Sequence, residues 1–424
     1  MIPLSEAQGF VLEACAPGPT RRVDLDDALG CVVAEPVVAT EPVPPFVNSS
    51  RDGFALRAVD SRSAGPDQPR SLRVVTTIMA GSAFAGTIGP GQAARIMTGA
   101  PLPAGADAVC MLEDCSEGAE PGTVVIDHPV VEGEAVRAVG EDVGVGELVT
   151  GAGTVLAPGH LGALANQGLE AVLVHPRPRI GVLSTGDELV SGPGPLAPGM
   201  IRDANRHTLL GLVRRQGWDP VDLGIVGDDE AALSEVLDRG AADCDAVVTS
   251  GGVSVGDLDI VKVVLEKRSG GTMRWMQVAI RPAKPFAFGT LAGPGTPVFG
   301  LPGNPVSAMV SFELFVRPGV RRMSGHRVLH RPEVTAGTEV DLPRQPDGKI
   351  HFVRARLFLD DRGGWRVRPV DGQDSHQLRA MADANALVVL PDGDGVAVGE
   401  PVEVMLIDPE QLGREVVGTG SPPW

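Results

Sequence analysis

Short apolar runs and amphipathic segments alternate regularly between residues 179 and 324. The apolar runs are rich in β-branched residues and predict strands at 180–183, 220–223, 246–249, 286–289 and 298–300. Segments with helical spacing lie among them, at 203–216, 229–239, 258–268 and 305–319. Because strands that alternate with helices build a sheet through crossover connections, the pattern predicts an open parallel-sheet α/β domain over residues 178–325.

The rest of the chain has shorter β-like runs between glycine and proline turns. Those in residues 46–138 predict a small β-rich domain, and those in residues 326–410 predict a small β-barrel. Proline-rich segments at 41–45 and 176–178 predict linkers. We expect residues 411–424 to form a disordered tail.

Residues 245–259 predict a strand, a tight turn and a helix in succession. The turn holds Gly251, Gly252 and Gly256, which can adopt positive φ and let backbone amides approach a ligand beside the positive end of a helix dipole. Asp257 and Asp259 follow, and two carboxylates beside a bound anion are best explained by a divalent cation between them. For a lone loop, the plainer alternative is a βα turn with aspartate helix caps.

Composition narrows the possible partners. The chain has 424 residues, a formal charge of −18 and no tyrosine, which argues against a nucleic-acid or membrane partner. An anionic ligand therefore needs a local cationic pocket or a metal ion. Five cysteines without a CxxC pair favour reduced thiols, and the absence of a leader-like start or a long apolar run predicts a cytoplasmic protein.

Polar loops follow the predicted strands, at 184–189, 227–229 and 301–305. The sequence has neither a GxxxxGK[ST] loop nor a Rossmann fingerprint, so it disfavours ordinary nucleotide-loop enzymes. The residues alone predict metal-assisted phosphate chemistry at the carboxyl edge of the sheet.

Five segments in register, 95–100, 140–142, 184–189, 249–259 and 301–307, closely resemble the MoeA family of molybdopterin molybdenumtransferases, which is related to the gephyrin E domain. The resemblance covers nearly the whole chain. It implies a discontinuous N-terminal domain, residues 1–45 plus 139–177, interrupted by the β-rich insertion. A capping box formed by Ser5 and Gln8 predicts the first helix of that domain.

The resemblance implies an elongated homodimer with composite active sites. It also implies insertion of molybdate into adenylylated molybdopterin with release of AMP, assisted by Mg²⁺. The functional acids fall on Asp52, Asp142, Glu188, Asp228 and Asp259, with Thr98 beside them, and the metal ligands on Asp257, Asp259 and Glu188. Asp228 has an equal alternative as a helix cap.

By the same resemblance, the molybdate ligands are Arg281, Lys284, Ser307, Arg354 and Ser375. The remaining contacts to the pterin substrate fall on Ser250, Gly251, Gly252, Ser254, Gly256, Pro302, Asn304 and Pro305. The chain departs from the family pattern at Arg51, Phe54, Arg281 and Ala283, where Met, Tyr, Lys and Gly are usual. Ala283 matters if its backbone needs positive φ.

Two alternatives remain open at this stage. A dimeric binding scaffold of the gephyrin type would need no chemistry, although it would have no need of the five acids and Lys284 either. A paralogue that inserts tungstate would have the same sequence features, because the two oxyanions are almost equal in size. Transient contact with the adenylyltransferase that supplies the pterin is a further expectation.

Overall fold

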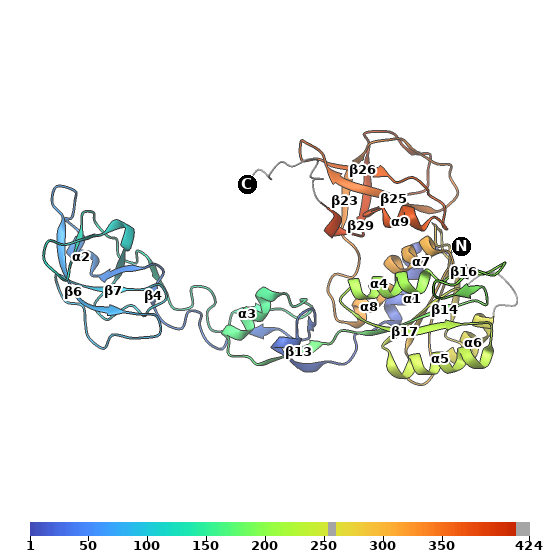
Figure 1. Ribbon diagram of the computed structural model, residues 1–424, viewed down its shortest axis with the longest axis horizontal. Helices are drawn as coiled ribbons and strands as arrows, with labels where there is room; N and C mark the ends of the chain where they lie inside the picture. Colours follow the sequence, from blue (N-terminus) through green and yellow to red (C-terminus); the bar gives the residue numbers. More distant parts are fainter. Residues whose placement is uncertain (253–259, 413–424) are drawn as a thin grey trace.

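A computed structural model describes residues 1–252 and 260–412, which form an extended body with a narrow waist (Figure 1). One end is an α/β domain with a β-barrel above it, and the other end is a β-rich arm. The described part of the chain contains no helix long and apolar enough to cross a membrane.

The α/β domain is built on a six-stranded sheet of order β17-β14-β18-β22-β21-β19. The strands are β14 (Arg179–Thr185), β17 (Asp219–Val226), β18 (Ala246–Ser250), β19 (Arg274–Gln277), β21 (Pro285–Thr290) and β22 (Pro297–Leu301). The first four in the sheet order are parallel, as predicted, but β21 runs antiparallel to both of its neighbours, β22 and β19. The short connection from β21 to β22 cannot hold a crossover helix, so the chain turns back as a hairpin.

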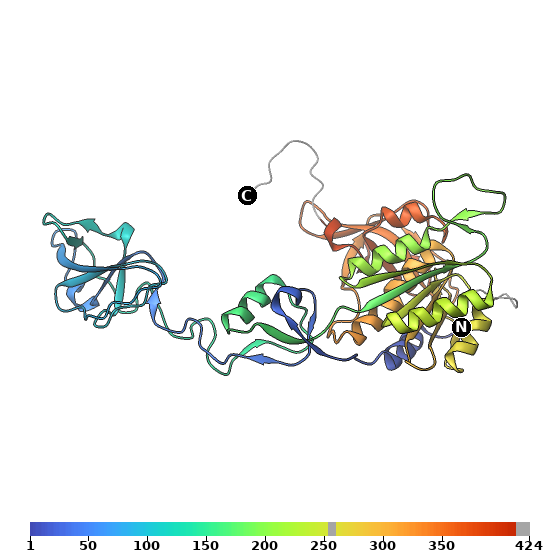
Figure 2. The same cartoon turned by 60° about the horizontal axis from the view of Figure 1, so that its bottom comes forward.

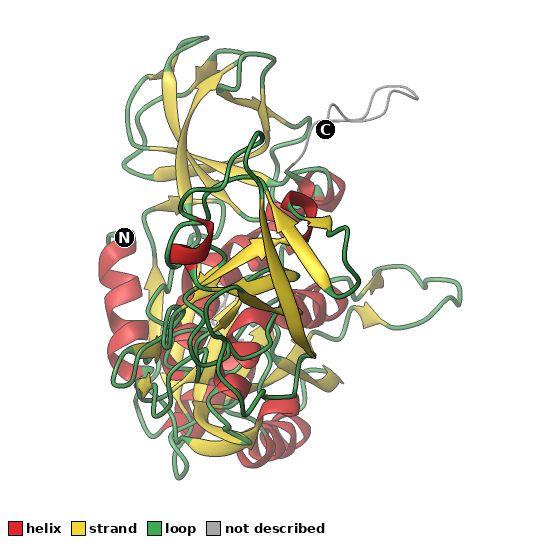
Figure 3. Ribbon diagram, turned by 90° about the vertical axis from the view of Figure 1, so that its left-hand side faces the viewer, coloured by secondary structure: helices red, strands yellow, loops and turns green. Residues whose placement is uncertain are grey.

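Helices cover both faces of this sheet (Figure 3). One face packs against α4 (Asn205–Arg215), α7 (Pro305–Ser311), a π-helix (Phe312–Val316) and α8 (Arg317–Met323). The other face packs against α5 (Glu230–Asp243) and α6 (Ile260–Ser269). The inner strands β14, β18, β22 and β21 are consequently buried on both sides, which explains their continuous apolar runs. A small pair, β15 (Leu189–Val190) and β16 (Ile201–Arg202), projects beyond the sheet.

Helix α1 (Leu4–Ala14) corrects two expectations. Its N-cap is Pro3, without a side-chain cap, so Ser5 and Gln8 do not form a capping box. Gln8 Nε2 instead donates to the carbonyl of Leu314 at 3.0 Å, and Pro318, four residues later, has no N–H for that carbonyl. Buried Ala7 and Val11 join the core of the α/β domain, so α1 packs there and not with residues 139–177.

The waist consists of two chain segments that pair with each other (Figure 2). Strands β1 (Arg21–Asp24), β2 (Val32–Val33) and β13 (Ala171–His175) form one sheet, and β3 (Val37–Val38) pairs with β12 (Leu148–Thr150). A 3₁₀ turn (Leu25–Asp27) and α3 (Pro158–Asn166) complete it. Three residues separate β13 from β14, so the amino ends of the parallel strands face the waist and their carboxyl ends face away from it.

The arm contains a six-stranded sheet of order β8-β5-β7-β6-β10-β9. Its strands are β5 (Gly53–Leu56), β6 (Arg70–Ile78), β7 (Gln92–Ile96), β8 (Ala108–Met111), β9 (Ser116–Glu117) and β10 (Thr123–Ile126). The pair β4 (Asn48–Ser49) and β11 (Val136–Arg137) brings the chain in and out, with α2 (Ala58–Ser61) and a 3₁₀ turn (Leu112–Asp114) between strands. The predicted β-rich character of this segment is confirmed.

The C-terminal sheet closes on itself, which confirms the predicted barrel. Its order is β25-β26-β23-β29-β27, and β27 pairs back with β25. The strands are β23 (Glu333–Thr338), β25 (Ile350–Leu359), β26 (Trp365–Pro369), β27 (Ala386–Leu390) and β29 (Pro401–Leu406). Strand β20 (Ile280–Arg281) adds to β25, β24 (Leu342–Pro343) pairs with β28 (Gly395–Val396), and α9 (Leu378–Ala382) and a 3₁₀ turn (Pro409–Gln411) follow strands β26 and β29.

Candidate active site

Backbone loops meet at the carboxyl edge of the parallel strands. Ser184, Thr185 and Ser250 are buried at the ends of β14 and β18. Thr185 Oγ1 donates to the carbonyl of Ser250 at 3.4 Å, and the Gly251 amide donates to the carbonyl of Leu301 at 3.1 Å. These bonds hold the glycine turn after β18 against both neighbouring strands.

Two glycines of this turn cannot be replaced without movement. Gly251 has φ 98° and Gly252 has φ 71°, so both use the positive φ that the sequence predicts. A Cβ on Gly251 would lie 2.7 Å from the Thr185 carbonyl oxygen, and one on Gly252 would lie 2.3 Å from Cβ of Val261. The rest of this predicted site, Ser254, Gly256, Asp257 and Asp259, lies outside the described residues.

Asn205 is a site residue that the sequence analysis missed. Its Nδ2 donates to Ser250 Oγ at 2.6 Å and to the Gly303 carbonyl at 2.7 Å, so one side chain joins the glycine turn to the segment of Pro302, Asn304 and Pro305. Asp203, also missed, accepts a bond from Ser184 Oγ at 2.9 Å and pairs with Arg206 Nε at 2.9 Å. The available signal was the Asp-x-Asn spacing before a helix, which resembles an ordinary cap.

Exposed carboxylates rim the same edge. Glu188 and Asp228 follow β14 and β17, and both are exposed. The Asp228 amide donates to Asp187 Oδ1 at 2.9 Å, which ties the two loops together. The helix cap of α5 is Asp229, whose carboxylate accepts from the Ala232 amide at 2.7 Å. Since Asp229 has the capping role, the capping alternative for Asp228 is wrong.

The segment with the predicted cations crosses from the sheet to the barrel. Arg281 lies opposite His351 of β25, whereas Lys284 immediately precedes β21 of the α/β sheet, and both are exposed. Between them, Ala283 is buried and has φ 75°. The position where the family usually has glycine does adopt positive φ, and this chain accommodates alanine there at some conformational cost.

Arg354 and Ser375 lie at the same junction. Arg354 is fully buried, and its Nη2 donates to the Gly372 carbonyl at 2.7 Å and the Asp374 carbonyl at 3.3 Å. Its Nε and Nη1 have no hydrogen-bond partner among the described residues. Burial lowers the pKa of this guanidinium from its ordinary value. Buried N–H donors without acceptors are costly unless a ligand completes them.

The loop that carries Ser375 reaches the sheet domain. Asn304 Nδ2 donates to Ser375 Oγ at 3.0 Å, and the Val306 amide donates to the Ser375 carbonyl at 3.1 Å. Ser307, the next residue of α7, is buried. The structure therefore connects the sheet-edge group to the barrel group through Asn304. Of the predicted oxyanion ligands, Arg281, Lys284 and Ser307 have no side-chain hydrogen bond or ion pair to this network among the described residues.

The remaining predicted acids lie in the arm and next to it. Thr98 donates to Asp52 Oδ1 from both its backbone N–H and its Oγ1, each at 2.7 Å. These bonds, the backbone one first, hold the pKa of the exposed Asp52 carboxyl below its usual range. Asp142 is exposed, and its amide donates to the Val43 carbonyl at 2.9 Å. No described contact joins Asp142 to Asp52.

Within one chain, the arm is remote from the sheet edge. Figures 1 and 2 place the arm beyond the waist, while the carboxyl ends of the parallel strands face the opposite way. One chain therefore carries Glu188 and Asp228 on two connected loops and, separately, pairs Asp52 with Thr98, but does not bring the two groups to each other.

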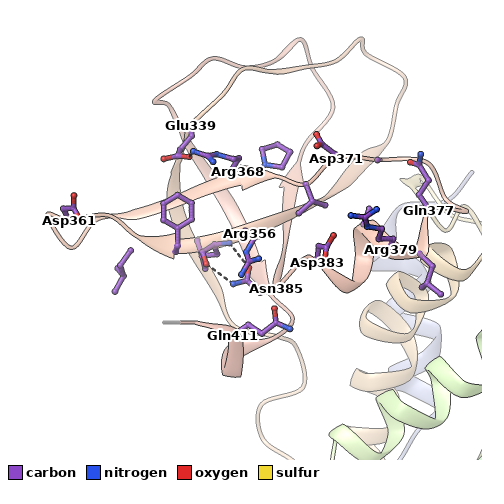
Figure 4. Close-up of a pocket in the computed structure, with 18 residues that line it drawn as sticks. Glu339, Arg356, Asp361, Arg368, Asp371, Gln377, Arg379, Asp383, Asn385 and Gln411 are labelled. Atoms are coloured by element: carbon purple, nitrogen blue, oxygen red, sulfur yellow. Dashed lines mark hydrogen bonds and ion pairs between the residues drawn. The ribbon is translucent and has the colours of Figure 1, made fainter. Parts of the chain in front are cut away.

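A cavity of about 1240 Å³ lies on the barrel, beside α9 (Figure 4). It is lined by charged side chains of both signs, among them Arg356, Arg368, Arg379, Asp371 and Asp383. None of the predicted site residues lines it. Arg368 is also paired with Glu339 of the cavity wall at 2.5 Å. The predicted residues of the sheet edge and of its junction with the barrel therefore lie outside this cavity.

Matches to known protein families extend over nearly the whole chain. Three family models match: the MoeA N-terminal region (domain I and II) over residues 2–168, a probable molybdopterin binding domain over 181–322, and the MoeA C-terminal region (domain IV) over 333–407. Molybdopterin molybdenumtransferase 2 of Mycobacterium tuberculosis is 40% identical over 399 residues, covering 93% of this chain and 96% of that protein. The chain belongs to the MoeA family.

Two further comparisons agree. The molybdopterin molybdenumtransferase of Haemophilus influenzae is 36% identical over 406 residues, covering 95% of this chain and 98% of that protein. The crystal structure of the molybdopterin biosynthesis MoeA protein of Pyrococcus horikoshii has a TM-score of 0.79 and 29% sequence identity, and covers 96% of this chain and all of that one. The resemblance inferred from five motifs is thus confirmed, and with it the fold of a MoeA protein.

Proposed function

We propose that this MoeA protein inserts molybdate into adenylylated molybdopterin and releases AMP. The observation that carries this proposal is the buried Arg354, whose Nε and Nη1 lack partners at the junction of sheet and barrel. A guanidinium with unused donors fits a compact oxyanion, because charge-assisted hydrogen bonds to such an anion are short and strong.

The sheet edge would bind the phosphate part of the pterin substrate. The turn at Gly251 and Gly252 would let backbone approach the phosphate groups, and Asn205 fixes that turn to Gly303. Arg281, Lys284 and Arg354 supply local positive charge in a chain whose formal charge is −18. These cations would hold molybdate close to the pterin and lower the cost of bringing two anions together.

Mg²⁺ dependence is part of the proposal. Exposed Glu188 and Asp228 offer the carboxylate oxygens that Mg²⁺ prefers, so the donor chemistry fits. Among the described residues no group of three His, Cys, Asp or Glu side chains is arranged to hold a metal ion. Asp257 and Asp259, which fall outside the described residues, would complete the ligands. A bound Mg²⁺ supplies charge neutralisation at the pyrophosphate from which AMP leaves.

We also infer a homodimer with composite sites. On the arm, two hydrogen bonds from Thr98 orient the Asp52 carboxylate, yet the arm is remote from the sheet edge of its own chain. Two-fold association that places the arm of one subunit over the sheet edge of the other would give two identical sites. Such a dimer makes use of the extended shape. A cytoplasmic location and transient contact with the adenylyltransferase complete the proposal.

The test is AMP release by the purified protein from adenylylated molybdopterin, with molybdate and Mg²⁺ added separately and together. We expect AMP and molybdenum-loaded cofactor only when both are present. Tight binding of the pterin without AMP release would overturn the enzymatic proposal and favour a scaffold. A parallel series with tungstate identifies the oxyanion that the site prefers.

A further inference from the structure

Two cysteines of the arm lie close together, and nothing in the proposed reaction uses them. Cys110 lies on β8, and Cys115 follows the 3₁₀ turn (Leu112–Asp114) after that strand. Their sulfur atoms are 3.0 Å apart, within a thiol–thiol hydrogen bond. All five cysteines are free thiols. We propose that Cys110 and Cys115 are a redox-active pair that hydroperoxides oxidise to an intramolecular disulfide.

The two thiols have unequal environments. Cys110 is fully buried, whereas Cys115 is partly exposed and reachable from solvent. The hydrogen bond between the two thiols lowers the pKa of Cys115, and the same bond together with burial raises the pKa of Cys110. The thiolate is the nucleophile in thiol oxidation, so Cys115 is the thiol that reacts first.

A histidine stands on the other side of Cys110. His128 Nε2 is 4.0 Å from Cys110 Sγ, and its Nδ1 is 3.2 Å from Asp127 Oδ1. The hydrogen bond to Asp127 raises the pKa of His128. Asp127 orients the ring so that Nε2 faces sulfur, and an imidazole in this place can accept the Cys110 proton when that thiol becomes the nucleophile.

The oxidation balances in two steps. The Cys115 thiolate attacks one oxygen of a hydroperoxide, the O–O bond breaks, Cys115 becomes a sulfenic acid, and the alkoxide or hydroxide leaves and takes up a proton. Cys110 then attacks the sulfenic sulfur, the S–S bond forms, and the S–OH oxygen leaves as water with the Cys110 proton. Two thiols supply two electrons, and the hydroperoxide is reduced to an alcohol, or to water if it is hydrogen peroxide.

The pair is adjacent to the loop of Asp52. The Leu112 amide, within the turn that joins the two cysteines, donates to the Asp52 carbonyl at 3.0 Å. A Cβ on Gly53 would lie 2.0 Å from the carbonyl oxygen of Cys110, so the two backbones are in direct contact there. A disulfide would close the turn covalently and restrict the strand pair that presents Asp52. Oxidation would therefore affect the backbone that carries Asp52, the candidate acid of the arm.

The experiment treats the full chain with stoichiometric hydrogen peroxide and maps thiols by mass spectrometry. We expect loss of two of the five free thiols, a peptide crosslink between Cys110 and Cys115, and full recovery with dithiothreitol. In Cys110→Ser, dimedone should trap a sulfenic acid at Cys115 at least about tenfold faster than at buried Cys244, whose pKa is raised to about 11. In Cys115→Ser, Cys110 should remain reduced.

Cys244→Ser is the matched control and should oxidise as the wild type does. Hydrogen exchange at the Leu112 amide, measured on the wild type, should slow on oxidation, and this readout needs no serine variant to fold. Oxidation of Cys115 no faster than of Cys244, or disulfides that link different chains, would overturn the proposal. No catalytic assay is involved, so the result is independent of the proposed activity.

Discussion

The sheet edge and the arm hold their predicted acidic residues in different ways. At the sheet edge, Glu188 and Asp228 are carried by loops that follow buried ends of strands, and the Asp187 side chain ties these two loops together. In the arm, Asp52 is exposed, and its carboxylate accepts two hydrogen bonds from Thr98. The first region is anchored on packed strands, whereas the carboxylate of the second is held by one adjacent residue. This difference fits an arm that completes a site belonging to another subunit.

The largest expected effect is loss of activity in two single variants and its partial recovery when their subunits form mixed dimers. Asp52→Ala and Glu188→Ala should each lower turnover on the order of 10²-fold or more. Dimers assembled from both variants should regain roughly a quarter of wild-type activity, because about half the dimers are mixed and each has one intact site. If mixed dimers are demonstrated but their activity stays at the level of the parent variants, the site lies within one chain.

Glycine replacement tests the packing of the sheet edge. Gly251→Ala should lower the free energy of unfolding of the α/β domain by about 2–4 kcal/mol, because positive φ and a backbone clash add together. The control is Gly303→Ala, where the nearest described atom to the new Cβ is 3.9 Å away and the expected change is within about 0.5 kcal/mol. Chemical denaturation compares them, and equal effects would contradict the claim that the turn is packed tightly.

Removal of a junction cation tests the oxyanion pocket. Lys284→Ala should raise the molybdate requirement by roughly 10- to 100-fold, since a charge-assisted contact contributes about 1.5–3 kcal/mol. Pterin binding should be unchanged. Lys262→Ala is a suitable control, because Lys262 lies on α6 over the ring of Trp275, on the other face of the sheet. If both variants change the molybdate requirement equally, only the overall charge is involved.

In the arm, we expect a smaller effect, on the pKa of Asp52 and on the pH-dependent stability that this residue contributes. The folded-state pKa of Asp52 is depressed, so the stabilisation from its bonds to Thr98 is complete above the ordinary value of 3.8 and is lost as pH falls through the lowered value. Thr98→Val removes the hydroxyl bond and keeps the stronger backbone bond, and should raise the pKa of Asp52 part of the way to 3.8. NMR titration measures this, and Thr98→Ser should leave the pKa unchanged.

The smallest effect concerns strain at the junction. Ala283→Gly relieves about 1 kcal/mol of positive-φ strain and loses about 0.8 kcal/mol of methyl burial, so the free energy of unfolding should change little. Ala287→Gly, at a buried position of β21 without positive φ, should cost about 1–2 kcal/mol. Similar losses in thermal unfolding for both variants would show that Ala283 is not strained.

Local patterning was sufficient for most elements. Buried strands such as β14 and β18 have continuous apolar runs, and the glycine turn after β18 was recognisable from the need for positive φ at Gly251 and Gly252. The position of α1 was not predictable, since its stripe of Ala7 and Val11 would fit any apolar surface. The antiparallel return of β21 and the linking role of Asn205 depend on contacts between distant segments.

The sequence by itself determined the alternating α/β core, the closed barrel, the family and the candidate acids, because periodicity and short motifs record local requirements of the backbone. The tertiary structure decided which side chains meet: Asn304 is bonded to Ser375, and Cys110 lies beside Cys115. It also buried Arg354 with two donors that have no partner among the described residues. It likewise placed the arm beyond the waist, remote from the sheet edge (Figure 1). Such pairings depend on chain reversals and domain placement, which are set by the summed burial of many residues and not by any local pattern.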